Sequence, residues 1–295
     1  MHIYALSVRT SDLSPEQLPK LVEALELLAM SLHRHGHLVY GDTPRPYLGF
    51  LPRAELGSEL AGLHLIVNLV LPDALAPANR KSYVKSGWER VETLAGYGIS
   101  MTCLGQEPVE PPFGLPEACA CERLSGYILD GERVYSAVGC LDCNSFVPIY
   151  TLPETYDATC ETSPVGEGYD DIHFLRRQLE ACDTLWFQGI HEALMVRLLN
   201  HPDSELSQTG RQVARRIEFL TGKPTYYLLM NTYETVYPED SDDAQEPAYS
   251  EAIQKPCPSC GQAWLLPEPL HLSYHFQCHP CRLISELPAN VDYNR

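Results

Sequence analysis

The sequence predicts an α+β protein with a ferredoxin-like sandwich at the N-terminus, a mixed α/β middle region and a C-terminal zinc ribbon. Three observations support this prediction. Residues 2–104 show strand and helix patterns in the order β-α-β-β-α-β. Helical apolar spacing dominates residues 171–221 and is followed by a strand-like run. The last forty-odd residues carry two Cys-x2-Cys pairs separated by 17 residues.

The first predicted region, residues 1–105, has two helices on one face of an antiparallel sheet. Ser14-Pro15-Glu16 begins the first helix, and Gly36 ends it. The expected strands are residues 2–9, 38–40, 63–71 and 99–104, and the expected helices are residues 14–36 and 82–97. This assignment leaves a long loop over residues 41–61, which is unusual in a compact domain.

The second predicted region, residues 106–233, follows a proline-rich stretch. Strands are expected at 133–138 and 146–152, on either side of a turn that contains a Cys-x2-Cys pair. The run from 171 to 199 has helical spacing, and Gly189 predicts a kink or a close contact within it. A further helix begins near Ser204 or Ser207 and ends at Thr221, and a strand is expected at 225–231.

Residues 234–251 form an acidic linker with seven acidic side chains and no basic one. Such a composition favours a solvated tether. Four of its carboxylates are candidate contacts for a basic partner: Glu239, Asp240, Asp242 and Asp243. The acidic stretch from Glu154 to Asp171 is a second candidate. Plain solubilising surface is the alternative interpretation for both.

The third region, residues 252–295, matches the spacing of a zinc ribbon. The predicted ligands are Cys257, Cys260, Cys278 and Cys281. Two cysteines three positions apart turn both sulfurs inward at a tight knuckle, and Gly261 supplies the backbone freedom after the first pair. Four thiolates leave no open position for water, so the predicted Zn²⁺ is structural. Three nearby histidines could substitute as ligands or lie beside them, or they are surface residues of strands: His271, His275 and His279.

A third Cys-x2-Cys pair, Cys140 and Cys143, raises the question of a second metal. With Cys119 and Cys121 it could form a site of the pattern Cys-x-Cys-x18-Cys-x2-Cys. The favoured interpretation is nevertheless two metal-free thiols on a strand turn, because Cys-x-Cys is an awkward bite for one tetrahedral zinc.

Composition limits the partners and the compartment. The formal net charge is −18 at pH 7, which repels nucleic acid and anionic lipid. The longest apolar run, residues 63–71, is too short to cross a bilayer. Eleven cysteines without a visible export signal favour a reducing, cytoplasmic environment. No nucleotide-binding or nucleophile-elbow motif is present, and the expectation is a protein that is not an enzyme.

Four segments resemble a bacterial family of zinc-ribbon-containing proteins of uncharacterised function: CLDCNSFVPIYTLP (140–153), EACDTLW (180–186), LSQTGRQVARRIEFLTGKPTYYLL (206–229) and CPSCGQAW with FQCHPCRLIS (257–285). The resemblance covers about the last 160 residues. It implies zinc binding by the four C-terminal cysteines and makes the Cys140–Cys143 pair a family feature. It also implies nucleic-acid binding, which the acidic charge opposes, and it brings no catalytic residue.

These observations favour a non-catalytic cytoplasmic protein that binds a basic protein partner. The sharpest form of this hypothesis is an immunity protein that neutralises a cognate basic, nuclease-type toxin. The alternative is a nucleic-acid-binding accessory protein that acts through its zinc ribbon. A third hypothesis is a hydrolase or transferase whose site is dispersed over the middle region.

Overall fold

The computed structural model describes residues 2–9, 13–38, 47–50, 62–69, 71, 73–106, 118–131, 136–155, 168–230 and 254–287. The chain forms two compact units. Unit 1 comprises Met1–Ala118, Val134–Ser136 and Phe146–Asp170, and unit 2 comprises Cys119–Arg133, Ala137–Ser145 and Asp171–Arg295. The predicted regions 106–233 and 252–295 therefore share unit 2 over most of their described residues.

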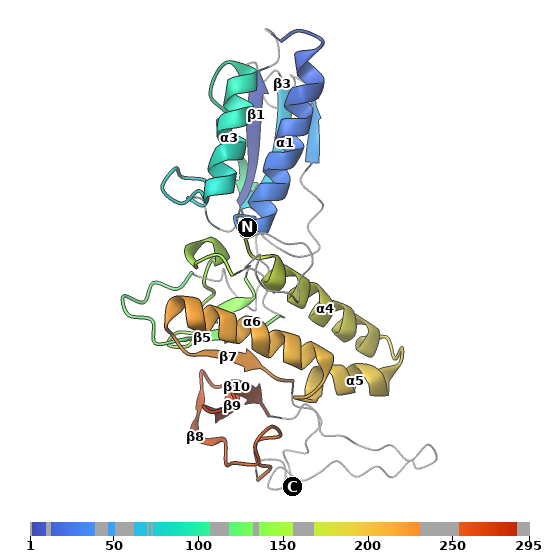
Figure 1. The fold of residues 1–295 in the computed structure, drawn as a ribbon, viewed down its shortest axis with the longest axis vertical. Helices are drawn as coiled ribbons and strands as arrows, with labels where there is room; N and C mark the ends of the chain where they lie inside the picture. The colour runs from blue at the N-terminus through green and yellow to red at the C-terminus, as the bar shows by residue number, and fades with distance from the viewer. Residues whose placement is uncertain are drawn as a thin grey trace. The chain divides into compact units, whose positions relative to one another are not determined.

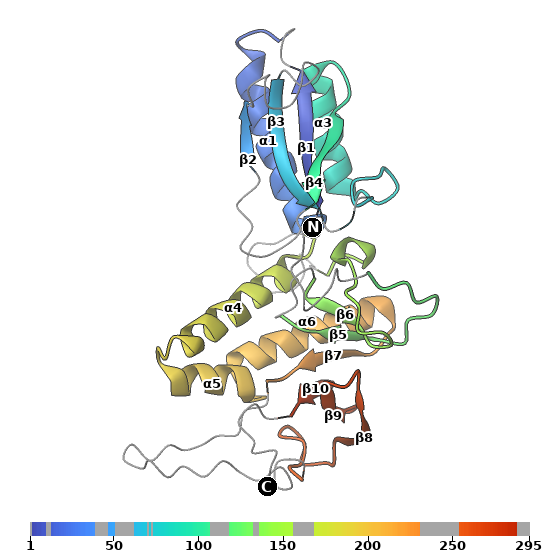
Figure 2. The same cartoon turned by 180° about the vertical axis from the view of Figure 1, so that it is seen from behind.

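Unit 1 contains a four-stranded antiparallel sheet in the order β2-β3-β1-β4. Its strands are β1 (His2–Arg9), β2 (Tyr47–Phe50), β3 (Gly62–Leu69) and β4 (Ser100–Gln106). Helices α1 (Gln17–Arg34) and α3 (Ser82–Ala95) cover one face of this sheet, as Figures 1 and 2 show. Along the chain, the elements follow the predicted order β-α-β-β-α-β.

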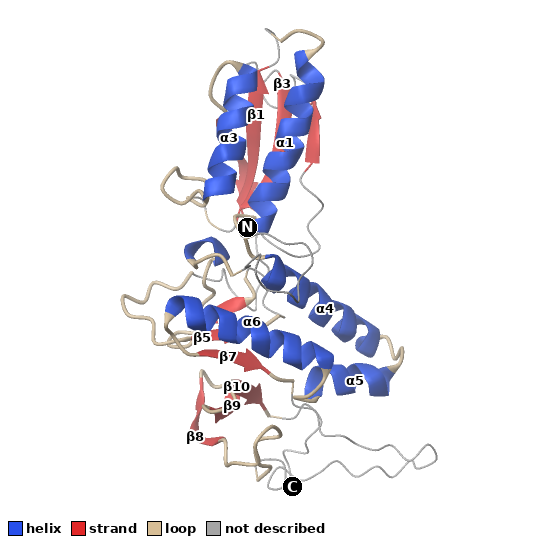
Figure 3. Cartoon of the chain, viewed as in Figure 1, coloured by secondary structure: helices blue, strands red, loops and turns tan. Residues whose placement is uncertain are grey.

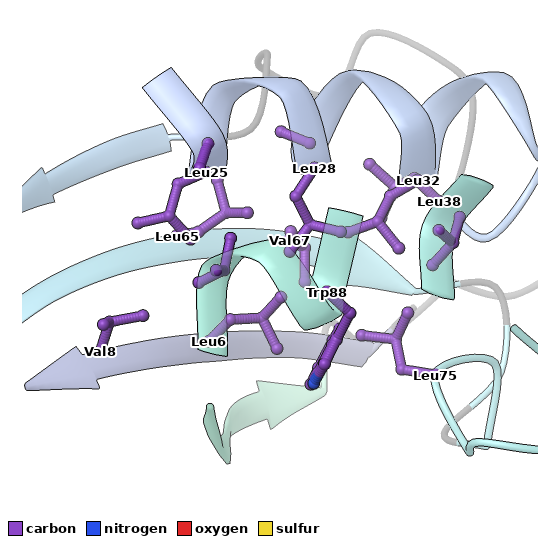
Figure 4. Close-up of a cluster of buried hydrophobic side chains, with 14 of the residues drawn as sticks. Leu6, Val8, Leu25, Leu28, Leu32, Leu38, Leu65, Val67, Leu75 and Trp88 are labelled. Carbon is purple, nitrogen blue, oxygen red and sulfur yellow. The ribbon is translucent and has the colours of Figure 1, made fainter. Parts of the chain in front are cut away.

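The core of unit 1 lies between that face of the sheet and the two helices (Figure 4). Leucines of α1 meet alternate residues of β1 and β3, and Trp88 of α3 closes the cluster. The buried side chains include Leu6, Val8, Leu25, Leu28, Leu32, Leu65, Val67 and Trp88. The strand period of two and the helical spacing of three to four residues place these side chains on facing surfaces. Gly36, at φ 70°, follows the end of α1 as the sequence predicts.

The second strand of unit 1 lies where the sequence predicts a loop. A strand was expected at residues 38–40; Leu38 forms a β-bridge and is buried in the core cluster, and residues 39 and 40 lie outside the described part of the chain. β2 forms at Tyr47–Phe50 and pairs with β3 from Tyr47↔Ile66 to Phe50↔Leu63. Strand pairing is a long-range contact, and local alternation in a short segment does not reveal it.

Unit 2 is built on a six-stranded mixed sheet in the order β6-β5-β7-β10-β9-β8. The strands are β5 (Tyr127–Leu129), β6 (Val138–Cys140), β7 (Thr225–Leu228), β8 (Leu265–Leu270), β9 (Tyr274–Cys278) and β10 (Leu283–Glu286). β7 runs parallel to both β5 and β10. The three C-terminal strands thus extend the sheet of the middle region, with which they form one structure.

The predicted strand pair on either side of the Cys140–Cys143 turn is wrong. β6 pairs instead with β5, at Tyr127↔Cys140. Within residues 146–152 the structure has a 3-10 turn at Ile149–Thr151. Pro148, which cannot donate a backbone hydrogen bond, lies just before this turn.

Three helices complete unit 2 (Figure 3): α4 (Asp170–Phe187, of which Asp170 belongs to unit 1), α5 (Glu192–Asn200) and α6 (Glu205–Thr221). The predicted kink at Gly189 is a full break, with φ 68° at Gly189 and φ 50° at His191. The predicted helix starting near Ser204 is confirmed, because the Ser204 hydroxyl accepts a hydrogen bond from the backbone N–H of Ser207 (3.1 Å). α6 packs on β7, where a Cβ at Gly210 would lie 2.2 Å from the Tyr227 ring.

The predicted acidic linker and its candidate contacts Glu239, Asp240, Asp242 and Asp243 lie outside the described residues. Most of the second acidic stretch, residues 156–167, does so too. Among the helices that the structure describes, none is both long and apolar enough to cross a lipid bilayer.

Two candidate metal centres

The four C-terminal cysteines converge as the sequence predicts. The Sγ atoms of Cys257, Cys260, Cys278 and Cys281, which we call the second cluster, all lie within 4.8 Å of one another. The sulfurs of Cys260 and Cys278 are 3.6 Å apart. A tetrahedral zinc with Zn–S bonds of about 2.3 Å places its ligand sulfurs about 3.8 Å apart. The second cluster therefore has the donor set and the spacing that a four-thiolate zinc centre requires.

A second group of four cysteines has the same property. The Sγ atoms of Cys119, Cys121, Cys140 and Cys143, the first cluster, also lie within 4.8 Å of one another. The Cys121 and Cys140 sulfurs are 3.9 Å apart. The sequence favoured metal-free thiols at Cys140 and Cys143; the structure brings Cys119 and Cys121 to them and so completes a set of four thiols that could hold a metal. The short Cys-x-Cys spacing does not prevent the four sulfurs from converging. Residues 119–121 lie in the segment before β5, and their two thiols meet the two thiols of the turn that follows β6.

All three Cys-x2-Cys turns share one backbone feature. The residue after the second cysteine is left-handed in each: Asn144 at φ 59°, Gly261 at φ 72° and Arg282 at φ 54°. In the first two turns this residue donates its backbone N–H to the carbonyl of the first cysteine, Asn144 to Cys140 (3.0 Å) and Gly261 to Cys257 (2.8 Å). The turn reverses the chain immediately after the second sulfur, so both thiols of a pair point to the same side.

The thiols of the second cluster differ in pKa because their surroundings differ. Burial raises the pKa values of Cys278 and Cys257. The backbone N–H of Gln262 and the neighbouring thiol of Cys281 lower the pKa of Cys260 to about 7. Removing the last protons from such a set requires a compensating positive charge close to the sulfurs. A divalent cation supplies that charge.

The first cluster shows the same division. Burial raises the pKa of Cys140 to about 11. Burial also acts on Cys143, but hydrogen bonds from Ser145 outweigh it and lower that pKa to about 7. The carboxylate of Asp142, inside the turn, accepts from the backbone N–H (2.6 Å) and the hydroxyl (2.5 Å) of Ser125. Asp142 thereby ties the turn to the segment that leads into β5.

The three histidines near the second cluster do not belong to it. The side chains that converge there as candidate metal ligands are the four cysteines. The ring Nδ1 of His275 is 2.8 Å from the carbonyl oxygen of Ser273. His279 lies on the second knuckle, with its Nδ1 atom 2.6 Å from the hydroxyl of Tyr226 on β7. His271 contacts the Cys140–Cys143 knuckle of the first cluster, at the carbonyl oxygen of Leu141.

The second knuckle is also anchored to α6. Arg282 donates from Nε and Nη2 to the two carboxylate oxygens of Glu218, at 2.8 and 2.7 Å. This bidentate ion pair lowers the pKa of Glu218 and raises that of Arg282. The backbone carbonyl of Arg282 accepts from Tyr227 on β7 at 2.9 Å. Helix, sheet and knuckle are thus held together at one residue.

The turn between β8 and β9 reaches the Cys140–Cys143 knuckle of the first cluster. His271 donates from its ring Nε2–H to the carbonyl oxygen of Leu141 at 2.8 Å. The hydroxyl of Tyr274 lies 3.4 Å from Oδ1 of Asn144. Between the clusters, Ile128, Tyr226, Tyr274 and Ile284 form a small buried core against which Leu141 packs. Both cysteine clusters are therefore part of one folded unit.

One of these relationships is visible in the sequence. Asn144 follows Cys143 as Gly261 follows Cys260, and asparagine adopts the left-handed conformation more readily than most residues other than glycine. Asn144, directly after the second cysteine, is therefore a signal in the sequence that the Cys140–Cys143 turn is a knuckle. By contrast, no local pattern links Glu218 to Arg282, 64 residues apart.

Comparison with protein families finds two matches in the second half of the chain. Residues 127–230 match a domain of unknown function (DUF2310), and residues 248–291 match another domain of unknown function (DUF8594). The first match begins after Cys119 and Cys121, so it covers only half of the first cluster. The second match includes all four cysteines of the second cluster.

Two Haemophilus influenzae proteins, each titled an uncharacterized protein, are similar to this chain. Each is 34% identical to it, over 113 and 114 residues, which is 38% of the chain in both cases. The aligned part is 49% of one relative and 38% of the other, so the chain spans half or less of their lengths. No solved structure matches the chain. Over part of its length, the chain is thus similar to proteins whose titles state no activity.

Proposed function

We propose that this protein is a non-catalytic binding protein whose two zinc centres are structural. Each cluster offers four thiolates and leaves no position for water or substrate on the metal, so zinc there would hold structure. Zinc in the first cluster would tie residues 119–121 to the β6 turn, and zinc in the second would tie the turn after residue 256 to β9 and β10. Both metals would stabilise the six-stranded sheet.

The binding partner that we propose is a basic protein. The observation that carries this proposal is the net charge of −18. Four thiolates and one Zn²⁺ carry −2, so two filled centres would lower the charge to about −22. Such a charge accelerates encounter with a cationic partner and disfavours phosphate backbones and anionic lipid. Reduced thiols fit a cytoplasmic location.

The specific form of the proposal is an immunity protein that neutralises a basic, nuclease-type toxin in the cytoplasm. Fast, charge-steered capture suits an inhibitor that must act before its target reaches nucleic acid. The candidate contacts are Glu239, Asp240, Asp242 and Asp243, with residues 154–171 as a further candidate.

The finer fold assignments belong to the same proposal. We infer a ferredoxin-like sandwich for unit 1, which the strand order β2-β3-β1-β4 and the two helices on one face support. We infer a zinc ribbon for β8, β9 and β10, which the second cluster and the spacing of its two knuckles support.

Affinity capture tests the binding proposal. The tagged full chain is compared with a variant that carries Glu239→Gln, Asp240→Asn, Asp242→Asn and Asp243→Asn, which keeps the size of each side chain and removes four charges. We expect the natural chain to enrich one strongly basic protein from cells that express both, and the variant to bind it more weakly and with a smaller salt dependence. Enrichment of no basic protein by the natural chain would contradict the proposal.

One observation favours the alternative, a nucleic-acid-binding accessory protein. Side chains of α6 and of the Cys278–Cys281 knuckle line a hollow of about 590 Å³, and they include Arg215, the exposed ring of Phe219, His279, and Arg282 with its ion-pair partner Glu218. A cation such as Arg215 beside an exposed aromatic ring is suited to single-stranded nucleic acid. This alternative requires binding that weakens steeply with salt and is lost in Arg215→Glu, measured by fluorescence anisotropy with a labelled oligonucleotide.

A further inference from the structure

The corner between α4 and α5 exposes a group of large apolar side chains. We call Leu185, Trp186, Phe187, Ile190 and Leu194 the α4–α5 apolar corner. No residue from 177 to 194 is buried. Phe187 is 87% exposed, Leu194 52% and Ile190 44%. Apolar side chains that are exposed singly are common, but three exposed ones within residues 187–194, next to the half-buried Leu185 and Trp186, mark a surface that another molecule covers.

The exposed corner continues a packing pattern that is satisfied only in the first half of α4. Ile172 and Leu175 are buried. Leu179 packs closely on Gly131, because a Cβ added to Gly131 would lie 2.2 Å from Cδ1 of Leu179. Cys182 and Trp186 continue the same spacing of three and four residues. α4 makes no extensive packing contact with any other described helix or strand. The second half of its apolar stripe therefore lacks an extensive packing partner among the described elements.

The corner is held in a defined conformation by its own backbone. Gly189, at φ 68°, donates its N–H to the carbonyl of Trp186, and Ile190 donates to the carbonyl of Leu185, both at 2.9 Å. These two hydrogen bonds form a Schellman motif at the end of α4. A surface that is already ordered loses little conformational entropy on binding, which favours docking.

We propose that the α4–α5 apolar corner binds the same corner of a second copy of this chain about a two-fold axis at the corner, which begins one helical turn after Cys182. The charges around it decide in favour of a second copy. Both signs occur along this segment, with Arg177 and Arg197 against Asp183 and Glu192, while Glu180 is already paired with Arg176. A two-fold interface places each patch against itself, so a patch that carries both signs pairs unlike charges.

The overall charge supports the same choice. Two copies with a net charge of −18 repel each other, and a nearly balanced face is where they approach at least cost. A strongly basic partner would instead be drawn to segments with an excess of acids. The proposed dimer is therefore independent of partner capture, and either can fail without the other.

The test is the molar mass of the zinc-loaded full chain, measured by light scattering after size-exclusion chromatography over roughly 1–100 µM, a range that brackets a micromolar Kd. We expect a mass near twice 33.1 kDa at the upper end. Phe187→Glu and Leu194→Glu should each shift the mass to that of the monomer. The matched control is Phe219→Glu, at a ring that is 80% exposed on α6, and it should keep the dimer. Unchanged zinc content and circular dichroism verify that each variant is folded.

Cross-linking places the axis. A short thiol-specific bifunctional reagent should join two copies of the natural chain at Cys182, and Cys182→Ser should remove that product. The proposal is overturned if the natural chain is a monomer throughout the concentration range, if both glutamate variants remain dimeric, or if peptide mapping of the cross-linked product finds no link between two Cys182 residues.

Discussion

The imidazole of His271 donates a hydrogen bond to the carbonyl oxygen of Leu141, 130 residues earlier, at 2.8 Å. Leu141 lies in the Cys140–Cys143 knuckle of the first cluster. His271 lies at the tip of the hairpin whose base carries Cys278 of the second cluster. This contact connects the two cysteine clusters. The His271 side chain restrains the backbone of the Cys140–Cys143 knuckle and leaves all four ligand positions to the cysteines. It also gives a structural role to a histidine that lies near the second cluster and is not one of its four candidate ligands.

Replacing His271 should loosen this connection. One lost hydrogen bond of this kind costs about 1 kcal/mol. We therefore expect His271→Ala to lower the melting temperature of the zinc-loaded protein by about 2–4 °C. His275→Ala is the control, because its ring contacts a carbonyl within its own turn. A variant that melts with the natural chain would show that the contact contributes no stability.

Metal content tests the two centres directly. We expect two zinc ions per chain by elemental mass spectrometry, because both clusters hold four sulfurs within 4.8 Å. Cys143→Ser and Cys260→Ser should each reduce the content to about one, since three thiolates hold structural zinc much less tightly. Cys182→Ser lies outside both clusters and should leave two. A content of one in both the natural chain and Cys143→Ser would remove the first centre.

The ion pair of Glu218 and Arg282 should govern how fast the second centre loses its metal. Glu218→Gln leaves the size unchanged but weakens the bidentate contact, at 2.8 and 2.7 Å, that holds the second knuckle on α6. We expect faster zinc transfer to a chromogenic chelator from one of the two centres, with the other unchanged. Glu180→Gln removes a different ion pair, with Arg176 on α4, and serves as the control. Equal rates in Glu218→Gln and the natural chain would show that the knuckle does not depend on this anchor.

Unit 1 should lose stability in mild acid because of His37. Its side chain is fully buried, its Nδ1 atom is 2.8 Å from the carbonyl of Ala74, and its ring stacks on Tyr150. Burial, helped by the nearby His35, Lys81 and Arg80, lowers its pKa from 6.5 to about 4, although the hydrogen bond to Ala74 acts in the opposite direction. The folded state therefore binds fewer protons than the unfolded chain between these values. The stabilisation is complete above pH 6.5 and is lost as the pH falls towards 4, by at most about 3 kcal/mol.

Hydrogen exchange in α1, followed by mass spectrometry, reports the stability of this unit without depending on the metal centres. His37→Asn keeps a polar group near Nδ1 and should flatten the pH dependence. His33→Asn, at a partly exposed site in the last turn of α1, should leave it unchanged. An unchanged pH dependence in His37→Asn would assign the acid sensitivity to other groups.

The sequence alone was sufficient for the features that depend on neighbouring residues. The Cys-x2-Cys spacing and Gly261 predicted the second cluster, since a knuckle is a local turn. Ser204 and Gly36 predicted helix ends because capping involves residues within one turn. The order of helices and strands in unit 1 followed from apolar periodicity for the same reason.

Only the tertiary structure decided the features that join distant segments. It placed Cys119 and Cys121 beside Cys140 and Cys143, and it put β2 at Tyr47–Phe50. It also joined β10 to β7, so that the three C-terminal strands and the middle region share a sheet. It also showed that the apolar stripe of α4 lacks an extensive packing partner in the described part of the chain. Such contacts depend on which segments pair across the whole chain, and residues that are close in sequence carry little information about that pairing.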